Sequence, residues 1–195
     1  IALTTCIACL VGLPLVIYGG LEMILIGIVC VVFCFLYTTS LSYMGLGDVL
    51  VLVFFGIVPV CTTYYIQFHT LTWTVVVASV ACGTVIDALL LVNNFRDRDT
   101  DSDAGKRTIV VRLGATMALR LYLATGWTAY AMGLLFWAEG HPLAFVLPTI
   151  YVVLHTSTYI KIKHINRGKA LNLCLGETAR NIFIYGLTVS VGLMI

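Results

Sequence analysis

Residues 71–92 read LTWTVVVASVACGTVIDALLLV, and Asp87 is the one charged side chain in this stretch. An α-helix rises about 1.5 Å per residue, and about 20 apolar residues cross the roughly 30 Å hydrocarbon core of a bilayer. The stretch therefore has the length and the composition of a membrane-spanning helix.

The composition of the whole chain agrees with this prediction. Of its 195 residues, 61% are hydrophobic and 10% are charged, and the mean hydropathy is +1.04. Ordinary soluble proteins carry about 25% charged residues, and a soluble chain of this size has too little interior to bury so much apolar surface. The net charge of +2 and the lack of a basic stripe exclude nucleic acid as a partner. We therefore expect an integral membrane protein in contact with lipids.

Seven runs are apolar and long enough to span a bilayer, which predicts an all-α, polytopic transmembrane helical bundle. The runs are Ala2–Tyr18, Leu21–Thr39, Asp48–Phe68, Leu71–Val92, Gly114–Trp137, Pro142–Ile160 and Gly176–Ile195. The first run starts at the beginning of the chain, without the pattern of a signal peptide. We therefore expect residues 1–195 to be a single transmembrane domain that is incomplete at its N-terminus.

The basic residues predict the orientation in the membrane. All 11 lie in or beside the two connectors that precede the fifth and seventh runs: Arg96, Arg98, Lys106, Arg107, Arg112, Arg120, Lys161, Lys163, Arg167, Lys169 and Arg180. Both connectors fall on one side of the membrane. By the positive-inside rule that side is cytoplasmic.

An acidic segment continues directly from the quoted stretch, and residues 87–103 read DALLLVNNFRDRDTDSD. If the helix persists, each residue turns by about 100°. Four side chains then share an arc of about 80°: Asp87, Asn94, Asp97 and Asp101. Asp99 and Asp103 point to the opposite side. One helix face therefore offers three carboxylates and an amide.

Oxygen ligands of this kind suit Mg²⁺, which keeps several waters and is held by one or two carboxylates together with substrate phosphates. Neighbouring cations could hold the phosphate oxygens that the metal does not reach: Arg96, Arg98, Lys106 and Arg107. Neither an EF-hand nor a P-loop fits, because Ser102 and Thr100 stand where these motifs require glycine. The alternative is a solvated loop that only sets topology, but Asp87, inside an apolar run, indicates a cavity or pathway.

Residues 93–108, NNFRDRDTDSDAGKRT, resemble the second aspartate-rich motif of the intramembrane aromatic prenyltransferases of the UbiA superfamily. The resemblance is strongest to the dihydroxynaphthoate polyprenyltransferases of menaquinone synthesis. Residues 43–48 (YMGLGD) and 64–67 (YYIQ) agree with that branch. In such a nine-helix fold the seven runs would be helices three to nine, and the first acidic motif would precede Ile1.

The resemblance implies Mg²⁺-dependent transfer of a polyprenyl group from polyprenyl diphosphate to an aromatic acceptor, dihydroxynaphthoate. Asp97 and Asp101 would be catalytic and, with Asn94, would bind the metal. The substrate pocket would include Asp87, Asn93, Tyr43, Asp48, Tyr64 and Tyr65. Aromatic rings in this set could shelter an allylic cation. Menaquinone synthesis further implies a bacterial plasma membrane with the site on its cytoplasmic side.

Other functions stay open at this point. Hydroxybenzoate, homogentisate, haem B and chlorophyllide are acceptors of other members of the superfamily. A transporter or divalent-cation channel would need acidic residues in several spans or broken helices, whereas Asp87 is essentially the one charge inside the runs. A non-catalytic scaffold would leave the spacing of Asp97 and Asp101 without a reason.

Overall fold

The computed structural model describes residues 2–195, and this part of the chain is helical without strands. In chain order the elements are α1 (Ala2–Gly19), α2 (Glu22–Leu36), the π-helical turn η1 (Tyr37–Leu41), α3 (Gly47–Val51), the π-helical turn η2 (Leu52–Ile57), α4 (Val58–Phe68), α5 (Trp73–Asp103), α6 (Ile109–Met132), α7 (Leu134–Ala138), α8 (Pro142–Val146), α9 (Thr149–Ile165) and α10 (Leu171–Met194). The predicted all-α class is confirmed.

The predicted number of spans is not confirmed. Among residues 2–195, five helical segments are long and apolar enough to cross a membrane, two fewer than the seven predicted: Glu22–Leu41, Gly47–Phe68, Trp73–Asp103, Ile109–Ala138 and Pro142–Ile165. The first run forms α1, which is apolar but shorter. The last run forms α10, which contains Glu177, Arg180 and Asn181, and these polar side chains lower its hydropathy.

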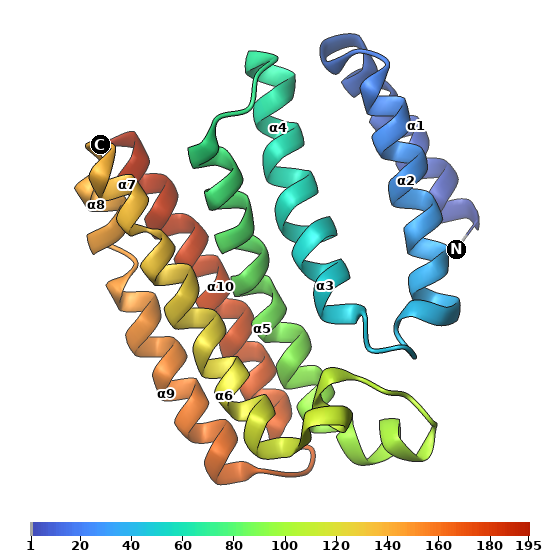
Figure 1. Ribbon diagram of the computed structural model, residues 1–195, viewed down its shortest axis with the longest axis vertical. Helices are drawn as coiled ribbons and strands as arrows, with labels where there is room; N and C mark the ends of the chain where they lie inside the picture. Colours follow the sequence, from blue (N-terminus) through green and yellow to red (C-terminus); the bar gives the residue numbers. More distant parts are fainter. Residues whose placement is uncertain (1) are drawn as a thin grey trace.

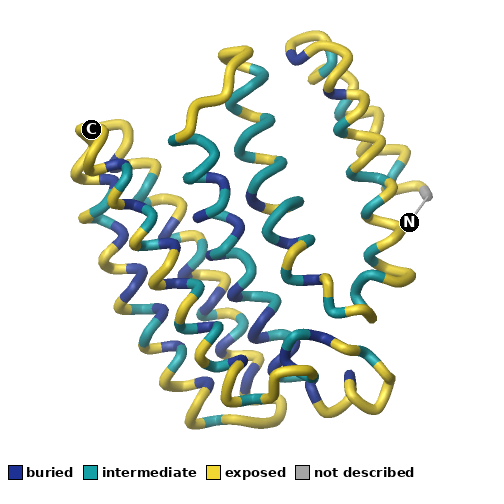
Figure 2. The backbone as a smooth tube through the Cα atoms, in the orientation of Figure 1, coloured by how far each residue is buried: buried dark blue, intermediate teal, exposed yellow. Residues whose placement is uncertain are grey.

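The helices form a bundle with a loosely attached hairpin at one edge (Figure 1). Helices α5, α6, α9 and α10 pack together, and the α3–η2–α4 segment packs along α5. The α1–α2 hairpin contacts the bundle through α4 and through Phe33, whose ring centre lies 5.2 Å from that of Phe54 in η2. Buried residues are concentrated in the α5–α6–α9–α10 body, whereas the hairpin is mostly exposed (Figure 2). The apolar exposed faces are those that a bilayer would cover.

Small residues let α5 and η2 come into close contact. A Cβ atom on Gly56 would overlap the backbone of Gly83, and it would lie 2.7 Å from the Ser79 carbonyl oxygen. Ser79 itself is fully buried. Close packing of this kind is the main attractive force between helices in lipid, where apolar burial contributes little. This crossing fixes the α3–η2–α4 segment against the helix that carries the acidic residues.

Buried polar side chains tie α10 to α6 and α9. Tyr122 and Thr178 share a hydrogen bond of 3.0 Å, and Asn181 Nδ2 donates to Thr158 Oγ1 at 3.1 Å. His155 Nε2 lies 2.8 Å from the carbonyl oxygen of Tyr122. Because each of these buried groups has a partner, they can lie in the apolar interior without a large desolvation cost.

Two loops meet at the end of the bundle where α5 terminates. The backbone N–H of Arg107 donates to the carbonyl oxygen of Tyr43 at 2.9 Å. Gly45, with φ of +76°, lies so close to the carbonyl oxygen of Arg107 that no Cβ would fit. The loop before α3 is thus attached to the loop after α5. Residues of both loops line a cavity at this end of the bundle.

Candidate active site

Helix α5 continues without interruption through Asp103, so the predicted extension beyond the apolar stretch is confirmed. Asn94, Asp97 and Asp101 line one cavity, whereas Asp87, the fourth residue of their predicted helix face, does not. Asp99 is exposed on another side, with its carboxylate 3.6 Å from Arg167. Asp103 is also exposed. The helical period therefore separates the acidic residues into a set in the cavity and a set in solvent.

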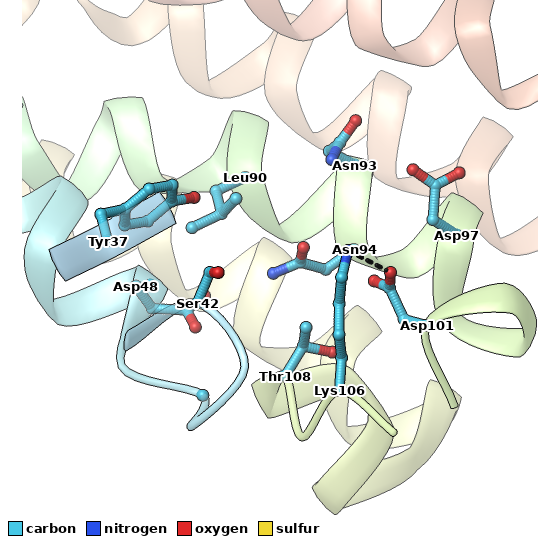
Figure 3. A pocket seen from close by; sticks show the side chains of 12 residues that line it. Tyr37, Ser42, Asp48, Leu90, Asn93, Asn94, Asp97, Asp101, Lys106 and Thr108 are labelled. Carbon is cyan, nitrogen blue, oxygen red and sulfur yellow. Dashed lines mark hydrogen bonds and ion pairs between the residues drawn. The ribbon is translucent and has the colours of Figure 1, made fainter. Parts of the chain in front are cut away.

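The cavity has a volume of about 110 Å³ and lies at the end of the bundle where α5 terminates. Its lining comes from two walls that are far apart in sequence: Tyr37, Ser42, Gly45, Gly47 and Asp48 on one side, and Leu90, Asn93, Asn94, Asp97, Asp101, Lys106 and Thr108 on the other. Figure 3 shows Tyr37, Ser42 and Asp48 facing Asn94, Asp101 and Lys106 across the space. Tyr37 and Ser42 were not predicted.

The cations of the site pair with its carboxylates. Arg96 donates two hydrogen bonds to Asp97, at 2.7 and 2.6 Å, and also donates to Asn93 at 2.8 Å. Lys106 Nζ donates to Asp101 at 2.8 Å. The hydrogen bond to Asp101 raises the pKa of Lys106, so this ammonium group stays charged at neutral pH. Two positive charges are therefore held beside the carboxylates that face the cavity.

The donor set fits a hydrated Mg²⁺ better than a metal enclosed by protein. No group of three or more His, Cys, Asp or Glu side chains at metal-binding distance occurs in residues 2–195. Asp97, Asp101 and Asn94 supply two carboxylates and an amide in a polar cavity. Mg²⁺ typically takes one or two carboxylates and completes its octahedron with water and phosphate oxygens. These three residues could hold such an ion.

Two carboxylate oxygens near the cavity have no protein partner. Oδ1 of Asp48 and Oδ1 of Asp87 are buried and lack a hydrogen bond among the residues that the structure describes. Asp48 lines the cavity. Asp87 is not part of the lining; it lies about two helical turns deeper along α5 than Asn94.

Seven of the sequence-predicted residues do not line the cavity: Asp87, Arg96, Arg98, Arg107, Tyr43, Tyr64 and Tyr65. Arg98 is buried against the Phe95 ring and donates to the carbonyl oxygen of Phe95 at 2.6 Å, with Asn166 as a second partner. The Arg107 side chain is exposed. Tyr64 and Tyr65 lie near the far end of α4, roughly 24 Å along the helix axis from Asp48. They are therefore too distant to contact a group bound in the cavity.

Tyr43 occupies the rim. It is 46% exposed, and Lys106 Nζ lies 5.8 Å from the centre of its ring. A cation at this distance over an aromatic face is weakly attracted to it. Tyr43 thus helps to position Lys106 rather than lining the cavity itself.

The chain is thus an all-α bundle with several helices long and apolar enough to cross a membrane, and it contains an acidic cavity with two cations paired to its carboxylates. Residues 1–185 match the UbiA prenyltransferase family, and the chain belongs to this family. No solved structure matches this chain.

Curated relatives agree with this assignment. The chain is 43% identical to a 1,4-dihydroxy-2-naphthoate octaprenyltransferase of Haemophilus influenzae over 46% of this chain and 30% of the relative. It is 36% identical to the Escherichia coli protein of the same name, over 62% and 42% respectively. It is 29% identical to the UbiA prenyltransferase domain-containing protein 1 homolog of Drosophila melanogaster, over 90% and 45%. The chain thus spans less than half the length of each of these relatives.

Proposed function

We propose that this protein transfers a polyprenyl group from polyprenyl diphosphate to the ring of an aromatic acceptor, with Mg²⁺ held by Asp97, Asp101 and Asn94. The observation that carries the proposal is the cavity in which these three side chains meet Lys106. When bound, the metal would neutralise charge on the diphosphate leaving group. Family membership supports this class of reaction.

The cations of the site would act on the same leaving group. As the allylic carbon–oxygen bond breaks, negative charge accumulates on the diphosphate, and a fixed positive charge nearby stabilises it. Lys106 lines the cavity and could donate to diphosphate oxygens. Arg96 is anchored by Asp97, Asn93 and Asn172, which keeps its guanidinium group next to the metal-binding carboxylates. We assign the diphosphate-binding role to Lys106 first and to Arg96 second.

The cavity fits the polar head of the donor substrate rather than its hydrocarbon tail. Its volume corresponds to several water molecules, since a single water occupies roughly 10–15 Å³ by the same measure. A long isoprenoid chain would lie outside it, along apolar helix surfaces. The length of that chain is therefore determined away from the residues that we assign to catalysis.

Dihydroxynaphthoate is the acceptor that we propose, because relatives at 43% and 36% identity carry that substrate in their names. We also propose a bacterial plasma membrane, with the site on the cytoplasmic side. The basic connectors that predict this orientation meet at one end of the bundle, where Arg167 lies beside Asp99 and Arg96 bonds Asn172.

The proposal is tested by assaying the full-length protein in lipid vesicles with dihydroxynaphthoate, a polyprenyl diphosphate and Mg²⁺. We expect a prenylated product and stoichiometric release of diphosphate, and we expect both to cease when EDTA removes the metal and to return when Mg²⁺ is restored. Turnover that persists in EDTA would contradict the metal assignment. Failure to release diphosphate with any aromatic acceptor of the superfamily would contradict the function itself.

A further inference from the structure

The wall of the cavity opposite the metal-binding residues has no role in the function proposed above. It is formed by Tyr37, Ser42, Gly45, Gly47 and Asp48. Its residues come from η1, the following loop and the first turn of α3, whereas the metal-binding residues all come from α5. The reaction needs two substrates, and only the diphosphate has been given a binding partner so far.

The most informative group on this wall is the carboxylate of Asp48. Its Oδ1 atom is buried and has no hydrogen-bond partner among the described residues, although the side chain lines the cavity. A buried carboxylate oxygen without a donor is costly. A bound molecule that presents an O–H or N–H group would remove that cost. The site is therefore complementary to a hydrogen-bond donor.

This requirement distinguishes between the two substrates. A polyprenyl diphosphate offers anionic oxygens, which accept hydrogen bonds, and a hydrocarbon chain, which has no donor. Its diphosphate would be repelled by Asp48. A hydroxylated aromatic acceptor carries phenolic O–H groups, which are donors. The carboxylate of Asp48 thus suits the hydroxylated aromatic substrate and disfavours polyprenyl diphosphate.

The surroundings of Asp48 also suit an aromatic ring. The Tyr37 ring and the Leu90 side chain lie within 4 Å of the position that a Cβ atom on Gly47 would occupy. Both residues line the cavity and are half-buried. They provide an apolar surface and one phenol beside the carboxylate. Tyr37 begins a π-helical turn, a distortion that is frequent at functional sites.

We propose that Tyr37, Leu90 and Asp48 form the binding subsite for the hydroxylated ring of the aromatic acceptor, with the carboxylate of Asp48 turning to accept a hydrogen bond from a phenolic hydroxyl. This inference rests on the proposed function and adds the residues that recognise the acceptor. It places the acceptor ring across the cavity from Asn94 and Asp101, as the two walls lie in Figure 3. The two substrates would thus bind toward opposite ends of the cavity.

The first test separates the KM values of the two substrates in the full-length protein. Asp48→Ala should raise the KM for dihydroxynaphthoate about 10- to 100-fold, the effect of losing a hydrogen bond to a charged group, and should leave the KM for polyprenyl diphosphate within about twofold. Tyr37→Phe should act in the same direction with a smaller effect. Asp99→Ala is the matched control, since Asp99 is exposed outside the cavity, and should change neither value.

A second measurement keeps the inference testable if turnover is lost. Competitive binding compares dihydroxynaphthoate with an analogue whose hydroxyls are methylated, in the wild type, in Asp48→Ala and in the isosteric Asp48→Asn. The wild type should prefer the hydroxylated compound, Asp48→Ala should bind both alike, and Asp48→Asn should retain part of the preference because its amide oxygen still accepts. A preference that survives in Asp48→Ala would overturn the assignment.

Two other outcomes would also overturn it. If Asp48→Ala raises the KM for polyprenyl diphosphate, or the Mg²⁺ requirement, more than the KM for the acceptor, Asp48 belongs to the metal and diphosphate site. If Asp48→Ala and Asp48→Asn both weaken the affinity for dihydroxynaphthoate and the affinity for polyprenyl diphosphate to the same extent, Asp48 has a structural role only. A wild type without prenyl transfer would refute the proposed function, while the binding comparison would still report on Asp48.

Discussion

Asp97→Ala and Asp101→Ala should each reduce prenyl transfer by at least about 100-fold, the largest loss of activity that we expect from a single substitution. Each change removes one of the two carboxylates that line the cavity on the α5 face. It also leaves a cation, Arg96 or Lys106, without its anionic partner. The rate of diphosphate release at saturating Mg²⁺, measured in the full-length protein in vesicles, checks this expectation.

The matched controls are the two carboxylates of the same helix end that lie outside the cavity. Asp99→Ala and Asp103→Ala make the same change in charge within a few residues, but both side chains are exposed. Their activity should remain within about threefold of the wild type, because exposed ion pairs contribute little. An equal loss in all four variants would mean that net negative charge, rather than the face of the helix, is what the reaction requires.

Gly56→Leu should cause the largest loss of stability. Its first added atom would overlap the backbone of Gly83 and lie 2.7 Å from the carbonyl oxygen of Ser79, so α5 and η2 must separate. Overpacking of this kind costs about 1–3 kcal/mol and more where backbone atoms cannot move. Thermal unfolding in detergent measures the effect, which should be a decrease in Tm of several degrees or failure to accumulate folded protein.

Gly186→Leu is the control for that experiment. Gly186 lies on α10, and a Cβ atom there would meet no other atom within 4 Å. Since Gly186 is exposed, a leucine at this position would face the surroundings of the bundle. Its Tm should stay close to that of the wild type. If Gly56→Leu were tolerated equally well, the close crossing of α5 and η2 would not be what holds the α3–η2–α4 segment in place.

The periodic features of this protein could be predicted from its sequence. The apolar stretch at 71–92 predicted a spanning helix, and α5 begins at Trp73. The 100° step per residue placed Asp87, Asn94, Asp97 and Asp101 on one face and Asp99 on another; the last three of that face line the cavity, Asp87 does not, and Asp99 is exposed. Both predictions depend only on geometry within one helix. They need no information about how the helices pack.

Features that depend on packing between distant segments were missed or misplaced. Tyr37 and Ser42 reach the cavity because a π-helical turn and the loop after it fold over α5, and their local sequence gives no sign of this. Tyr64 and Tyr65 follow Asp48 closely in the sequence, but the rise of the intervening helix places them near the end of α4 that is distant from the cavity. Arg98 is diverted from the cavity by Phe95 and by Asn166 of the α9–α10 loop.

The central claim is that Asp97 and Asp101 hold a divalent metal ion in the cavity, and metal binding tests it most directly. Mn²⁺ can replace Mg²⁺ as a paramagnetic probe, and its binding to the full-length protein can be followed by electron paramagnetic resonance with inorganic pyrophosphate present. We expect binding to the wild type and to Asp99→Asn, and an affinity at least about tenfold weaker in the Asp97→Asn, Asp101→Asn double variant. Equal Mn²⁺ affinity in the wild type and the double variant would contradict the account.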